Sequence, residues 1–100
     1  MDNKAKAEII RKAADLIDQR GLAKGVYIDE HRCLCIFGAL NEIEYGDANS
    51  GSSKIPTYIY DALFAEGIND ISIIDFNDTH TKEEVIAEMK FWADKVEAMQ

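Results

Sequence analysis

The chain has few residues of several types, and each scarcity excludes a class of protein. Its 100 residues include one proline, two cysteines and two histidines. No apolar run approaches the length of a membrane-spanning helix, which takes about 18 residues or more. The first seven residues, MDNKAKA, lead into an amphipathic pattern and not into an apolar signal region. We therefore expect a cytoplasmic protein that does not contact a membrane.

Basic residues are also scarce. The chain has 11 lysines and arginines against 19 aspartates and glutamates, which gives a net charge of −8. Residues 1–20 carry five basic and four acidic side chains, so the acidic excess lies in the remaining 80 residues. Binding to phosphates requires lysines and arginines that displace counterions, so direct nucleic-acid binding is not expected. Two interpretations remain: a solubilising acidic surface, or a surface that competes with nucleic acid for a basic groove on a partner.

The remaining composition is that of a folded protein. Apolar residues make up 47% of the chain and charged residues 30%, which is ordinary for a globular domain and wrong for a disordered one. A chain of this length suits one domain over residues 1–100. Cys33 and Cys35 are predicted to be reduced thiols, because side chains two apart on a strand lie too far apart to form a disulfide easily.

The spacing of apolar residues predicts a fold that is mainly α. Apolar residues recur at three- and four-residue spacing in four stretches, which are 4–20, 36–45, 57–66 and 82–99. We therefore predict a compact bundle of about four helices. Gly38 lies inside the second helix and indicates close packing of that helix on another element.

Two shorter segments complete the predicted fold. Val26, Tyr27 and Ile28 favour a strand, and a turn at Asp29 would let the chain return antiparallel, which predicts a short β-hairpin near residues 26–35. The apolar run in residues 70–76 is too short for an ordinary helix, so we expect one short turn of helix followed by a loop.

The stretch DFNDTHTKEE, residues 75–84, contains a helix start and a candidate site. Thr81 and Glu84 have the spacing of a capping box, which predicts a helix beginning here. Asp75, Phe76, Asn77 and Asp78 precede it, and two interpretations stay open. The polar side chains can fold the loop back on itself, or Asn77 and Asp78 can line a cleft and offer an amide and a carboxylate to a partner.

Three motifs together resemble a family of small proteins of unknown function found in actinobacteria and bacteriophages. They are RKAADLIDQRGLAKG, CIFGAL with its Cys-x-x-Gly-Ala-Leu pattern, and FNDTHTKEEV with its aromatic-Asn-Asp step before Thr-x-x-Glu-Val. Leu22 and Phe76 stand where the family pattern has tryptophan. The resemblance implies an origin among phage or mobile-element proteins. It implies no activity, because the family has none assigned.

A catalytic interpretation centres on Cys35. A thiol near the N-terminus of a helix can have a lowered pKa, and His31 or His80 could act as its base, as in a cysteine hydrolase. A cysteine between Leu34 and Ile36 is more often a small buried apolar residue. We therefore place a Cys35-dependent hydrolase below a binding function.

Metal and cofactor sites are not expected. Cys33, Cys35, His31 and His80 are groups that zinc prefers, but the Cys-x-Cys spacing is atypical and no second ligand pair follows. A calcium loop starting at Asp75 lacks the glycine that its sharp turn requires.

The favoured hypothesis is a small acidic binding protein without catalytic activity. Its partner would be a host protein, and its action could be to inhibit a host nucleic-acid-binding or defence protein. Aromatic anchors dominate interface energetics, so Tyr45, Tyr58 and Phe91 join residues 75–78 as candidate contact residues. If Trp92 is buried, Phe91 lies about 100° away around the helix and is partly exposed. Oligomeric state stays open, with a homodimer as one alternative.

Overall fold

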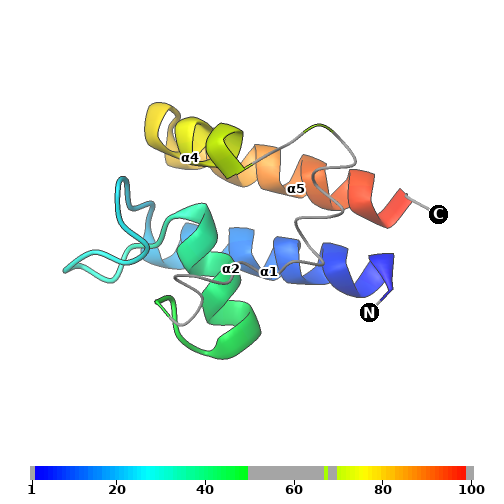
Figure 1. Ribbon diagram of the computed structural model, residues 1–100, viewed down its shortest axis with the longest axis horizontal. Coiled ribbons are helices and arrows are strands. Elements are labelled where there is room, and N and C mark those ends of the chain that lie inside the picture. Colours follow the sequence, from blue (N-terminus) through cyan, green and yellow to red (C-terminus); the bar gives the residue numbers. More distant parts are fainter. Residues whose placement is uncertain (1, 50–66, 68–69, 99–100) are drawn as a thin grey trace.

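The computed structural model describes residues 2–49, 67 and 70–98 of the chain. The described residues form four helices, labelled in Figure 1: α1 (Asn3–Arg20), α2 (Ile36–Tyr45), α4 (Asp70–Thr79) and α5 (Lys82–Ala98). The mainly α fold class and the helical bundle are thus confirmed. The helix predicted for residues 57–66, together with Tyr58, lies outside the described residues.

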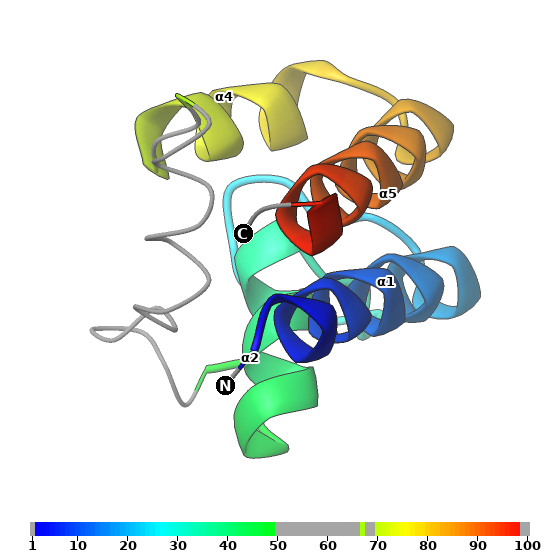
Figure 2. The same ribbon diagram turned by 90° about the vertical axis from the view of Figure 1, so that its right-hand side faces the viewer.

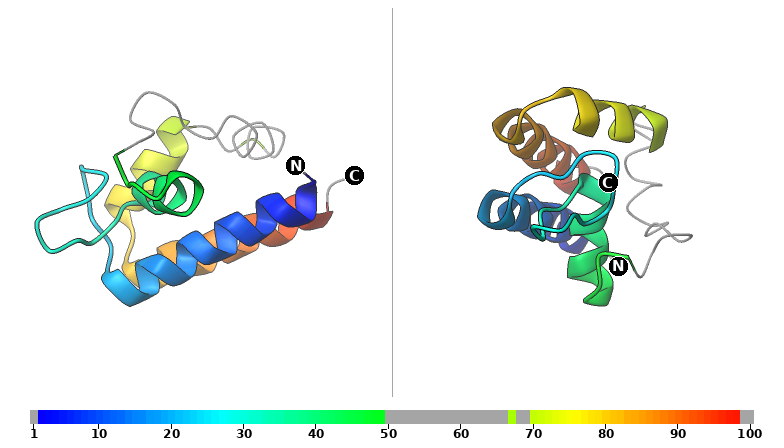
Figure 3. Two further views of the ribbon diagram at one scale, coloured as in Figure 1. Left: turned by 90° about the horizontal axis from the view of Figure 1, so that it is seen from below. Right: turned by 90° about the vertical axis from the view of Figure 1, so that its left-hand side faces the viewer.

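The two long helices form the base of the molecule. α1 and α5 lie side by side along their length and run in opposite directions (Figures 1 and 3). Arg11 on α1 reaches two carboxylates on α5, Asp94 at 2.8 Å and Glu97 at 2.9 Å. α2 packs against α1 at a steep angle, and α4 lies near the start of α2 (Figure 2).

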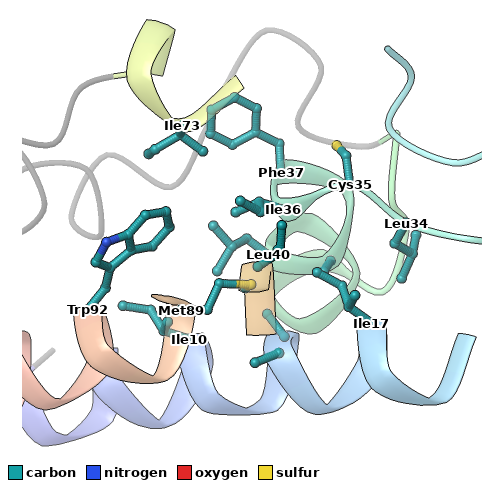
Figure 4. Packing of buried hydrophobic residues seen from close by; sticks show 14 of the residues in the cluster. Ile10, Ile17, Leu34, Cys35, Ile36, Phe37, Leu40, Ile73, Met89 and Trp92 are labelled. Atoms are coloured by element: carbon teal, nitrogen blue, oxygen red, sulfur yellow. The ribbon is translucent and has the colours of Figure 1, made fainter. Parts of the chain in front are cut away.

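All four described helices contribute to one apolar core (Figure 4). The stripe predicted for the last helix is buried at Val85, Met89, Trp92, Ala93 and Val96. Of its other two predicted members, Ile86 is partly buried and Met99 lies outside the described residues. The buried side chains meet those of α1 and α2, and the largest fully buried apolar residues of those two helices are Ile10, Ile17 and Ile36.

The ends of the helices are set by capping residues that can be recognised in the sequence. The Asp2 carboxylate accepts the N–H of Ala5 at 2.7 Å and so caps α1. The predicted capping box is confirmed in both directions: the Glu84 N–H donates to the Thr81 hydroxyl at 3.2 Å, and the Thr81 N–H donates to the Glu84 carboxylate at 3.0 Å. α2 ends at Gly46, which is left-handed with φ of 73°.

The predicted β-hairpin is wrong. Among the described residues, segment 22–34 has only two single-residue bridges, Leu22 with Leu34 and Ile28 with Leu34, and no strand. The antiparallel pairing consists of two hydrogen bonds, from the Asp29 N–H to the Cys33 carbonyl at 3.1 Å and from the Cys35 N–H to the Tyr27 carbonyl at 3.2 Å. Leu34 itself bonds on its other side to the residues after α1. Its N–H donates to the Gly21 carbonyl at 3.0 Å, and its carbonyl accepts from the Ala23 N–H at 2.9 Å. The next residue already caps α2, so no length of chain remains for a returning strand.

The loop predicted after the short helical turn at residues 70–76 is also wrong. α4 continues without a break to Thr79 and includes Asn77 and Asp78. Asparagine and aspartate favour turns when their side chains bond the local backbone. Here the Asn77 side chain bonds two distant backbone groups instead, at Ala23 and Ile36, and this removes the local competition with the helix.

Replacement of Gly38 tests the close packing of α2, which the sequence predicts correctly. A β-carbon at this position would overlap the backbone carbonyl of Tyr27. Helix propensity alone would make Gly38→Ala stabilising by about 1 kcal/mol. We expect the opposite sign, a loss of about 1–3 kcal/mol in the free energy of unfolding, because backbone must move to admit the methyl group. Urea denaturation measures the change, and a variant at least as stable as the wild type would contradict this packing.

Candidate functional site

A cleft opens where the start of α2 meets α4 and the connecting segment 25–28. Its volume is about 640 Å³. The described residues that line it are residues 25–28, 35–37, Asn49, Ile73, Ile74, Asn77 and Asp78. Figure 4 shows Phe37 of α2 next to Ile73 of α4, with Cys35 at the residue before α2. The cleft therefore forms between elements that are distant in the sequence.

Most of the cleft is apolar. Phe37 and Ile73 are buried in its wall and also belong to the core. Two aliphatic side chains at the cleft stay half exposed, Val26 at 50% and Ile74 at 49% of their full surface. A cavity in this size range with an apolar wall and a few polar groups is typical of a binding site.

Asn77 joins the elements at the polar end of the cleft through hydrogen bonds of its side chain. Its side chain is 3% exposed. Its Oδ1 accepts the N–H of Ile36, the first residue of α2, at 2.9 Å, and its Nδ2 donates to the Ala23 carbonyl at 2.9 Å. Nδ2 also donates to the Asp78 carboxylate at 3.0 Å. The amide thus lines the cleft while its hydrogen bonds go to the protein itself.

Asp78 stands beside it and accepts hydrogen bonds from the described residues through one of its two carboxylate oxygens. Both hydrogen bonds that Asp78 accepts go to Oδ1, from Asn77 and from the Gly25 N–H at 3.2 Å. The side chain is partly buried and lines the cleft. Oδ2 takes no hydrogen bond from the described residues.

Cys35 also lines the cleft, as the N-terminal cap of α2. Its Sγ accepts the N–H of Gly38 at 3.3 Å, and the side chain is buried. Burial raises the pKa of the Cys35 thiol above its ordinary value and outweighs the backbone N–H groups that lower it; the nearby Asp78 charge raises it further. A lowered pKa, which a helix N-terminus would favour, is therefore not found.

Neither histidine joins Cys35. His31 is exposed, with its ring 3.5 Å from the Glu30 carboxylate. His80 stacks on Phe76 with ring centroids 3.8 Å apart, and its Nδ1 lies 2.9 Å from the Phe76 carbonyl. Neither is among the described residues that line the cleft. Within residues 2–49, 67 and 70–98, no group of three or more histidine, cysteine or acidic side chains could hold a metal ion.

The other predicted contact residues are spread over the surface. Phe76 packs against the core between His80 and Trp92, and Asp75 is exposed on α4. Tyr45 and Phe91 are 47% and 52% exposed, so the predicted exposure of Phe91 is confirmed. Neither lines the cleft.

Val26 and Ile74 were not among the residues predicted from the sequence. A usable signal exists for Ile74, because adjacent isoleucines at 73 and 74 on a helix cannot both face one core. The sequence gives no such signal for Val26, because its exposure follows from the absence of the predicted hairpin.

Fold and site together define a small, mainly helical protein with an apolar cleft at a helix start. The chain belongs to DUF6197, a family of unknown function, which matches residues 1–95. No curated protein and no solved structure gives a significant match to this chain. None of the helices in the described part of the chain has the length and apolar character needed to cross a membrane.

Truncation of Asn77 tests its role in joining the elements of the site. Asn77→Ala leaves the buried N–H of Ile36 and the buried carbonyl of Ala23 without partners, which should cost about 3 kcal/mol in the free energy of unfolding. Urea denaturation measures the loss. The matched control is Asp75→Ala on the exposed side of α4, which should change stability by less than about 0.5 kcal/mol. Equal effects of the two substitutions would contradict the role of Asn77.

Alkylation tests the state of Cys35. In a Cys33→Ser variant, iodoacetamide should modify Cys35 more slowly at neutral pH than it modifies a free thiol in a short peptide, because burial disfavours the thiolate. Mass spectrometry follows the reaction. Labelling of Cys35 faster than of the peptide thiol would show an activated nucleophile.

The raised pKa of Cys35 also predicts a dependence of stability on pH. Because the pKa is raised in the folded state only, the free energy of unfolding should fall as the pH rises through the ordinary thiol pKa of about 8.5.

Proposed function

We propose that this chain is a small acidic binding protein of phage or mobile-element origin that acts without catalysis in the cytoplasm. It would bind a host protein by accepting one of that protein's apolar side chains into the cleft. The observation that carries this proposal is the half-exposed pair Val26 and Ile74 beside an apolar cleft of about 640 Å³. When a partner covers exposed aliphatic groups beside such a cleft, the burial of their apolar surface favours binding.

The overall charge supports a partner with a basic surface. A net charge of −8 raises the rate of encounter with a positively charged protein and disfavours encounter with nucleic acid. A host nucleic-acid-binding protein or a defence protein with a basic groove fits this requirement. Inhibition would follow if the acidic protein occupied that groove.

The alternative function, a hydrolase that uses Cys35, has less support. Cys35 does line the cleft beside Asn77 and Asp78. Its thiol is buried, accepts a backbone N–H and has a raised pKa, whereas a nucleophile requires the opposite shift. The described residues that line the cleft include no histidine to act as a base.

Affinity capture with matched variants tests the proposal. Wild-type protein, Ile74→Ser and Phe91→Ser are each immobilised and exposed to a bacterial host lysate, and bound proteins are identified by mass spectrometry. Ile74 and Phe91 are exposed to nearly the same extent, 49% and 52%, but only Ile74 lines the cleft. We expect a stoichiometric partner that wild type and Phe91→Ser retain and Ile74→Ser loses.

Two outcomes would count against the cleft as the binding surface. If Phe91→Ser loses the partner and Ile74→Ser keeps it, the exposed face of α5 is the interface. If wild type enriches no protein, the binding hypothesis itself fails. Light scattering on the three proteins separates self-association through Phe91 from binding of a partner.

A further inference from the structure

Among the described residues, the charge that lines the cleft is of one sign, negative. Asp78 is the only charged side chain among the described residues that line the cleft. Its Oδ1 is held in place by the Gly25 N–H and by Asn77, and its Oδ2 is left without a hydrogen bond from the described residues. A carboxylate fixed in this way is oriented before any ligand arrives, so binding loses little side-chain entropy.

Asp78 also stands next to the apolar wall. Ile74 on the same helix and Val26 in segment 25–28 line the cleft with it, and both are half exposed. One bound segment can therefore fill the apolar space and reach the carboxylate at the same time. The groups it needs are an apolar side chain and, close to it, a cation.

We propose that the cleft recognises a protein segment in which an apolar side chain is followed closely by lysine or arginine. The apolar side chain packs against Val26 and Ile74, which line the cleft half exposed, and the cation pairs with the Asp78 carboxylate. This inference rests on the proposed binding function and names the chemistry of the partner. A second copy of this chain is a less favourable occupant than a basic partner, because two chains of net charge −8 repel.

A library of random displayed peptides provides the probe, since it assumes no partner. Panning against the wild-type protein should enrich peptides with an aromatic or large aliphatic residue next to lysine or arginine. The enriched peptide is then synthesised with a fluorescent label, and its dissociation constant is measured by fluorescence polarisation.

Asp78→Asn is the variant that isolates the charge. Its amide oxygen can still accept from Gly25 and from Asn77, so the local hydrogen bonds remain while the charge is lost. We expect affinity for the peptide to fall about 10- to 100-fold, the range for loss of a hydrogen bond to a charged group. Asp75→Asn removes the same charge from an exposed position of α4 that does not line the cleft, and should have little effect.

A change in the peptide completes the cycle. Replacing its lysine or arginine by glutamine should weaken binding to the wild type and to Asp75→Asn, but not further to Asp78→Asn. The glutamine peptide tests the pairing on wild-type protein even if Asp78→Asn does not fold.

Each outcome decides between the two proposals. Enriched peptides that are apolar without a basic residue would overturn this inference and leave the proposed function standing. Equal losses with Asp75→Asn and Asp78→Asn would overturn it too, because the effect would then be one of overall charge. A library that yields no binder, or binders that Ile74→Ser retains in full, would overturn the cleft as a binding site and with it the proposed function.

Discussion

The amide of Asn77 is the contact on which the site depends. One planar group accepts from the first N–H of α2 and donates to the carbonyl of Ala23, so it joins three parts of the chain at distances of 2.9 Å. A buried amide with all these bonds made rigidifies its surroundings, and the same amide with a bond missing would destabilise them. The position of the cleft follows from this contact, because its two walls are α4 and the start of α2.

The apolar and polar parts of the cleft have different origins. Phe37 and Ile73 are packed core residues behind the cleft, and the half-exposed Val26 and Ile74 supply its accessible apolar surface. Asp78 is set by its neighbours on the chain and by the Gly25 N–H. A site built on packed helices positions its groups more accurately than a site on loops. The arrangement places one charge beside an apolar surface, and Cys35 takes part in it as a helix cap.

The success of sequence-based prediction in this protein depends on the range of the interactions involved. The Thr81–Glu84 box and the buried stripe of α5 use residues within a few positions of one another, and both are predictable. Gly38 is predictable as a close contact, although its neighbour Tyr27 is not. Asn77 bonds residues 41 and 54 positions away, and no local pattern contains that information. The hairpin stays at a single antiparallel bridge because Cys35, which would continue the returning strand, caps α2.

The cap of α2 has a consequence for the kind of molecule that the cleft can admit. A helix start commonly attracts phosphates and carboxylates, since its first amides point outward with no partner. In this protein the Ile36 amide is occupied by Asn77, and the Gly38 amide is occupied by the sulfur of Cys35. An incoming anion would have to displace these groups and then approach the Asp78 carboxylate. Two of the first amides of α2 are therefore not available to a phosphate, and the adjacent carboxylate makes the terminus less favourable still for an anion.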